Sequence, residues 1–141
     1  MRKIRITQKF AGVVLAVLAA FMLTSRSKKM IFETSSIVPA ACGSVKIKTD
    51  KNKNYTVEVD VDNLSPADQL SPSKKTYVVW MTPKNSETQN IGQLKSSTSF
   101  LSKALKGSLT TVTSSKPKSI FITAEDEGNT QYPGTIILST N

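Results

Sequence analysis

Residues 55–62 carry the pattern that most restricts the fold of this chain. Apolar and polar side chains alternate without interruption, with Tyr55, Val57, Val59 and Val61 on one side and Thr56, Glu58, Asp60 and Asp62 on the other. Because successive side chains of a β-strand point to opposite faces, this alternation predicts a strand with one buried face. Residues 45–48 alternate in the same way, and the polar segment 50–54 lies between the two. We therefore predict a β-hairpin.

A second apolar run predicts a strand in the middle of a sheet. Tyr77–Met81 is continuously apolar, contains the only tryptophan of the chain, Trp80, and is followed by the turn-rich segment 83–86. Apolar runs of this length, bounded by turn signals, are typical of the central strands of a sandwich. We expect Trp80 to anchor the core between two sheets, and Tyr77, three positions away, to lie on the opposite face of its own sheet.

Shorter β-prone segments follow at residues 107–113, 119–124 and 135–138, separated by polar turns. Residues 100–105 leave two alternatives open, one or two helical turns or an irregular strand. Short strands at regular spacing with little helix favour an all-β fold, an antiparallel β-sandwich of about six or seven strands.

The N-terminus has the organisation of an export signal. A basic stretch, residues 1–9, precedes an uninterrupted run of 14 apolar residues, Phe10–Leu23. A membrane-spanning helix needs about 20 apolar residues, whereas the core of a signal peptide has about 7–15. We predict a signal peptide or a signal-anchor helix in residues 1–29 and a folded domain in residues 30–141. Both alternatives place the domain in the periplasm or outside the cell, and the second anchors it in the cytoplasmic membrane through residues 10–23.

The positive charge of the chain does not predict a nucleic-acid partner. The net charge is +9, but residues 1–29 hold seven basic side chains and no acidic one. Residues 30–141 hold 12 basic and 10 acidic side chains, so the domain itself is close to balanced. A nucleic-acid-binding domain needs a basic excess of its own. Membrane contact is expected only through the N-terminal segment.

The single cysteine, Cys42, cannot form a disulfide within the chain, so the domain relies on its core for stability. Residues 38–42 resemble a lipoprotein cleavage site only superficially. Pro39 stands where such sites have an aliphatic residue, and Cys42 lies 19 positions after Leu23. We interpret Cys42 as a small residue near the first strand of the domain.

Few residues suggest chemistry. The chain has no histidine, and its serines and threonines have no base spaced for a catalytic triad, so we predict no catalytic residue and no cofactor. The acidic segment Glu125–Asn129 has oxygen ligands that suit calcium, and Asp60 and Asp62 on one strand face suit a cation or a sugar. Both are also what solvated loops and strand faces contain, and that interpretation is preferred. We predict no metal site.

Four segments together resemble the extracytoplasmic C-terminal domain of the anti-sigma-K factor family. They are Tyr77–Met81, Ile91–Leu94, Phe121–Glu125 and Tyr132–Leu138. The matching residues are Trp80 at the end of the first segment, Gly92 and Leu94 in the second, Glu125 at the end of the third, and the corner Pro133–Gly134 in the fourth. Glycine supplies backbone freedom at turns and proline a fixed φ, so we read Gly92, Pro133 and Gly134 as turn or corner positions.

The resemblance covers roughly residues 45–140. It implies a β-sandwich on the outer side of a bacterial cytoplasmic membrane that acts in regulation or sensing. Anti-sigma factors of this kind also carry a cytoplasmic helical domain, usually with a His/Cys zinc motif, which this chain lacks. We therefore expect a stand-alone, non-catalytic binding or sensory module for an envelope protein or a small ligand. A structural or surface-association protein is the alternative, and a hydrolase or lectin-like domain comes third.

Overall fold

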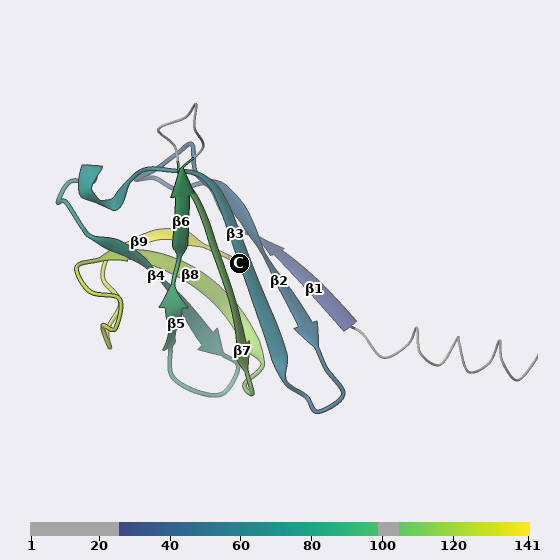
Figure 1. The fold of residues 1–141 in the computed structure, drawn as a ribbon. Helices are drawn as coiled ribbons and strands as arrows, with labels where there is room; N and C mark the ends of the chain where they lie inside the picture. Colours follow the sequence, from purple (N-terminus) through teal and green to yellow (C-terminus); the bar gives the residue numbers. More distant parts are fainter. Residues whose placement is uncertain (1–25, 99–104) are drawn as a thin grey trace, which may run out of the picture.

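The structure is a computed structural model that describes residues 26–98 and 105–141 (Figure 1). The described residues form nine strands in two antiparallel sheets. The five-stranded sheet has the order β1 (Arg26–Ile31), β2 (Cys42–Thr49), β3 (Tyr55–Leu64), β7 (Leu105–Thr113), β6 (Lys95–Thr98). The four-stranded sheet has the order β5 (Gln89–Gln93), β4 (Thr76–Pro83), β8 (Pro117–Glu125), β9 (Ile136–Ser139). A single 3-10 turn, η1 (Ala67–Gln69), precedes β4.

The all-β prediction and the predicted hairpin are confirmed. Strands β2 and β3 pair antiparallel, with Val45 opposite Val59 and Ile47 opposite Val57. The predicted number of strands was wrong, because nine are present in the described ranges instead of six or seven. Two of the strands that the sequence did not indicate, β1 and β6, are the edges of the five-stranded sheet and are mostly polar. An edge strand is held by backbone pairing to one neighbour and needs no apolar alternation.

The sandwich begins earlier than the predicted boundary at residue 30. Residues 26–29 belong to β1, which pairs with β2 along its whole length, from Arg26 opposite Thr49 to Ile31 opposite Ser44. The boundary therefore lies at or before Arg26. The predicted signal or anchor helix falls on residues 10–23, outside the described residues. In the ranges that the structure covers, no helix has the length and apolar character needed to cross a bilayer.

The core lies between the inner faces of the two sheets. The five-stranded sheet contributes Val45, Val57 and Val59, all at most 1 % exposed. The four-stranded sheet contributes alternate residues of β4 and β8: Tyr77, Val79, Met81, Ile120, Ile122 and Ala124. Because side chains alternate along a strand, the residues between these ones in β4 and β8 point to the outer face of the four-stranded sheet.

The segment after β1 connects the two sheets. The backbone N–H of Phe32 donates to the carbonyl of Gly43 in β2, and the N–H of Glu33 donates to the carbonyl of Ser139 in β9. Phe32 itself is buried in the shared core. Backbone hydrogen bonds at this corner thus hold one edge of the sandwich closed.

Candidate functional site

Trp80 is fully buried, but it does not lie between the two sheets. Its neighbours in β4, Val79 and Met81, belong to the shared core, so Trp80 points to the outer face of the four-stranded sheet. The predicted core position of Trp80 was therefore wrong, whereas the predicted opposite orientation of Tyr77 is confirmed. The continuously apolar run Tyr77–Met81 gave no indication of which face turns inward, because both faces of β4 are covered.

Two residues of β8 contact Trp80 on this outer face. The ring of Phe121, directly opposite in the β4–β8 register, stacks on the indole with centroids 6.2 Å apart and an interplanar angle of 11°. The indole Nε1–H donates a 2.7 Å hydrogen bond to Thr123 Oγ1. A buried indole N–H needs such an acceptor. Thr123 is itself fully buried.

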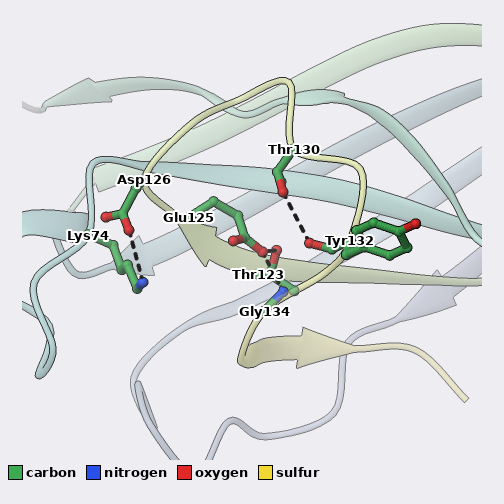
Figure 2. Close-up of polar contacts among 7 residues, drawn as sticks. All are labelled: Lys74, Thr123, Glu125, Asp126, Thr130, Tyr132 and Gly134. Atoms are coloured by element: carbon green, nitrogen blue, oxygen red, sulfur yellow. Dashed lines mark hydrogen bonds and ion pairs between the residues drawn. The ribbon is translucent and has the colours of Figure 1, made fainter.

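A short chain of hydrogen bonds continues from Thr123 to the loop that follows β8 (Figure 2). The Thr123 hydroxyl donates to Glu125 Oε1 at 2.6 Å. The same carboxylate oxygen accepts the backbone N–H of Gly134 at 2.6 Å. Glu125 is only 8 % exposed. Burying a carboxylate is costly unless donors surround it, and the two donors supply that compensation here.

The loop of residues 126–135, called the β8–β9 loop below, crosses the outer face of the sheet. Asn90 of β5 donates from Nδ2 to the carbonyl oxygens of Gly128 and Thr130, at 2.9 and 3.0 Å. Since Asn90 pairs with Trp80 across the sheet, these bonds bring the loop over the indole. An ion pair of 3.3 Å between Lys74 and Asp126 lies at the start of the loop.

The second half of the β8–β9 loop is presented to solvent. Residues 131–136 are all exposed, and Tyr132 reaches 81 %. The Thr130 hydroxyl donates to the Tyr132 carbonyl at 3.2 Å, which helps to define the backbone there (Figure 2). Ile136, at the start of β9, is 50 % exposed. The aromatic side chain of Tyr132 on the loop and the aliphatic side chain of Ile136 at the start of β9 are thus exposed to solvent, while the bond between Gly134 and Glu125 fixes the backbone between them.

Four of the six residues singled out by the sequence meet at this site. Trp80 and Glu125 are linked through Thr123, Gly134 bonds to Glu125, and Pro133 precedes Gly134 in the exposed part of the loop. The expected backbone freedom of Gly134 was wrong, because its φ is not positive. A Cβ at that position would lie 3.1 Å from both carboxylate oxygens of Glu125. The close approach of the Glu125 carboxylate to the backbone explains why position 134 is a glycine.

Leu94 lies apart from this site and Gly92 at its margin, where the Gly92 N–H donates to Asn90 Oδ1 at 3.0 Å; both also contact the five-stranded sheet. The predicted turn position of Gly92 was wrong, because Gly92 lies within β5 beside a register shift in its pairing with β4. Its φ of +135° does use the backbone freedom of glycine, and a Cβ there would meet Leu109 of β7 at 3.2 Å. Leu94 is buried and packs near Gly107, also in β7. These two residues support the packing of the sheets.

The acidic residues considered for calcium or sugar do not converge. Glu125 is buried at the end of β8, and the exposed Asp126 pairs with Lys74. Asp60 and Asp62 lie on the outer face of the five-stranded sheet, where Asp62 is 3.6 Å from Lys106. Within residues 26–98 and 105–141, no three acidic or cysteine side chains are grouped as metal ligands. Cys42 is exposed at the start of β2.

Sequence reasoning missed Thr123 and Asn90, which connect the site. The only available signal for Thr123 was a polar residue inside the otherwise apolar strand Ile120–Ala124. Asn90 carried no signal, because its partners Gly128 and Thr130 are 38 and 40 positions away. No family of proteins, curated protein or solved structure matches this chain in comparison. The geometry of the β8–β9 loop is therefore the observation that bears on function.

Proposed function

We propose that this chain is an exported, non-catalytic binding or sensory module that contacts an envelope protein through the β8–β9 loop. The observation that carries the proposal is the exposed Tyr132 on a loop whose base is held by the buried Glu125. A loop fixed before binding loses less conformational entropy on association. Tyrosine supplies a large contact area with few rotatable bonds.

The resemblance to the anti-sigma-K extracytoplasmic domain supports the same location for the contact. Trp80, Glu125, Pro133 and Gly134, taken from three of the four resembling segments, gather at the loop. On this basis we propose a role in envelope signalling, with regulation of sigma-factor activity as its most specific form. The domain would then act in the periplasm or outside the cell. Retention of residues 10–23 in the cytoplasmic membrane would tether it there.

A protein partner is preferred over a small ligand. The hollow beside the loop, lined by Ile37, Leu70, Pro72 and Ile137 among others, has a volume of only about 60 Å³. Pockets for small molecules usually have about 300–1,000 Å³. Residues 131–136 instead form a continuous exposed segment, which suits a protein partner.

Structural self-association is the second candidate, and strand β9 favours it. This four-residue strand is the edge of its sheet, beside the exposed Ile136. Glu33 already bonds to this edge at Ser139, so the start of β9, at the exposed Ile136, is the part that offers a template for pairing with a second copy. Concentration-dependent oligomerisation of the purified chain, abolished by Ile136→Lys and without a heterologous partner, would favour this candidate.

Site-specific photo-crosslinking in cells tests the leading proposal. A photoreactive residue replaces Tyr132 in one variant and Val112 in the control, which is 65 % exposed on the outer face of the five-stranded sheet. We expect a discrete adduct with one envelope protein from position 132 and not from position 112. The purified partner should then bind the Tyr132→Ala chain at least about tenfold more weakly. Identical adducts from both positions would argue against a contact at the loop.

A further inference from the structure

The net positive charge of the described residues is confined to one end of the sandwich. This end is formed by the start of β1, the β2–β3 turn, the β4–β5 connection and the β7–β8 turn (Figure 1). It holds two acidic side chains, Asp50 and Glu87, and seven basic ones: Arg26, Lys28, Lys51, Lys53, Lys84, Lys116 and Lys118. The other described residues hold seven basic and eight acidic side chains. We call this end the basic end.

Four lysines of the basic end and Arg26 line two neighbouring hollows. One hollow of about 350 Å³ is lined by Lys28, Lys84, Lys116 and Lys118 together with Asn85 and Pro117. A neighbouring hollow is shared by Arg26, Lys28 and Lys116. The two turns are tied by a backbone hydrogen bond from Lys84 N–H to the Lys116 carbonyl. Within the described ranges, Lys28, Lys84, Lys116 and Lys118 take part in none of the side-chain ion pairs that Lys48, Lys74 and Lys106 make elsewhere.

The apolar run of the sequence is attached to this same end. Three peptide bonds separate Leu23, the last residue of the run, from Arg26. Covalent geometry keeps their Cα atoms within about 11 Å of each other in any conformation. If residues 10–23 are held in a bilayer, Arg26 must therefore lie near the lipid headgroups, whereas the tether alone does not fix how the rest of the basic end is oriented toward them. Basic side chains within a Debye length of an anionic surface are attracted to it.

We propose that the basic end is a docking surface for the phosphate-bearing headgroups of anionic lipids. The lysine-lined hollow receives headgroup phosphates, and the contact orients the sandwich on the membrane. The β8–β9 loop starts at the opposite end of β8 and folds back along the outer face of the four-stranded sheet to Asn90, so it lies beside this sheet, outside the basic end, where a partner can reach it. This inference rests on the proposed retention of residues 10–23 in a membrane, but it does not depend on which partner the loop binds.

Energy transfer between a labelled chain and labelled vesicles tests the proposal on the full chain. A donor is attached to a cysteine at Ser86, in the basic end, or at Gln131, in the β8–β9 loop, in a Cys42→Ser background. The acceptor is a headgroup-labelled lipid in vesicles of phosphatidylcholine with or without phosphatidylglycerol. We expect transfer from position 86 to exceed transfer from position 131 in the anionic vesicles, and the excess to disappear without phosphatidylglycerol. Raising the salt from about 0.1 M to about 1 M, where the Debye length falls from about 10 Å to about 3 Å, should also remove it.

A matched pair of variants separates the effect of the basic end on energy transfer from the effect of the net charge of the whole chain. Lys84→Glu/Lys116→Glu/Lys118→Glu should abolish the excess transfer from position 86. The control variant is Lys29→Glu/Lys46→Glu/Lys95→Glu, which changes the net charge by the same amount at exposed positions elsewhere in the five-stranded sheet. This variant should leave the excess transfer from position 86 unchanged. Equal effects of the two variants, or equal transfer in both kinds of vesicle, would overturn the proposal. Loss of transfer on adding duplex DNA at the same phosphate concentration would overturn it in favour of nucleic acid. Crosslinking at position 132 reports on the loop alone, so failure of one proposal is distinguishable from failure of the other.

Discussion

The backbone N–H of Gly134 donates a 2.6 Å hydrogen bond to the carboxylate of Glu125, nine positions earlier. This bond closes the β8–β9 loop at its base, and the carboxylate is held from the other side by Thr123. The loop is thereby connected, through two side chains, to the buried indole of Trp80. A change in the loop and a change around Trp80 are therefore expected to affect each other.

Removing the Glu125 carboxylate should loosen the loop and destabilise the domain. Glu125→Ala leaves the Gly134 N–H and the Thr123 hydroxyl without their acceptor, and we expect a loss of about 2–4 kcal/mol in the free energy of unfolding. Urea unfolding measures the loss, and amide exchange at Gly134 reports the loop. The control is Asp126→Ala, which removes a partly exposed ion pair with Lys74 and should cost less than about 1 kcal/mol. Equal losses in the two variants would contradict a special role for Glu125.

The fluorescence of Trp80 should report on the β8–β9 loop, because Trp80 is the only tryptophan of the chain and is linked to Glu125 through Thr123. In the native chain its fluorescence should resist quenching by iodide, since the side chain is 0 % exposed. Trp80→Ala should destabilise the domain by about 3–5 kcal/mol, as expected for a large buried side chain. In Glu125→Ala, iodide should quench Trp80 more strongly under conditions in which the chain stays folded. Unchanged quenching would mean that Phe121 and the sheet alone protect the indole.

The two glycines should respond differently to alanine. Gly92→Ala places a side chain at a φ of +135° and 3.2 Å from Leu109, so we expect a loss of about 1–3 kcal/mol in stability. Gly134→Ala requires only a shift of the Glu125 carboxylate by a few tenths of an ångström, and its cost in stability should be smaller. Thermal unfolding of the two variants compares the costs. A larger loss for Gly134→Ala would show that the carboxylate cannot move.

Tyr77 should make the stability of the domain fall at high pH. Its hydroxyl donates to the Ser65 carbonyl at 2.6 Å, and burial raises the pKa of Tyr77 to about 12 from its usual value of 10. Because the folded-state pKa is the higher one, this contribution to stability is complete below pH 10 and is lost as the pH rises toward 12. Tyr77→Phe should cost about 1 kcal/mol at neutral pH and reduce the fall between pH 10 and 12. Urea unfolding across this range, with Tyr132→Phe as the exposed control, measures both effects.

The strands that sequence reasoning located are those whose side chains alternate or form long apolar runs. Strand β3 and its hairpin with β2 followed from the alternation of Tyr55–Asp62, because alternation is a local consequence of strand geometry. Strands β1 and β6 did not follow, because the pairing that makes them strands is supplied by β2 and β7. Of the six residues named from the resemblance, Trp80, Glu125, Pro133 and Gly134 lie at or below the loop, and Gly92 and Leu94 contact β7. Their separation into a loop site and a packing pair was not foreseen.

The sequence by itself determined that the domain, as far as residues 26–98 and 105–141 describe it, is all-β, which faces of β2 and β3 are apolar, and that Tyr77 and Trp80 point to opposite sides of β4. Only the tertiary structure decided which of these two sides is the interior. Both faces of β4 are covered, the inner one by the second sheet and the outer one by a loop that begins 46 positions after Trp80. Local periodicity carries no information on such distant partners. The position of Trp80, the network through Thr123 and Glu125, and the gathering of lysines at one end all depend on contacts between segments far apart in the chain.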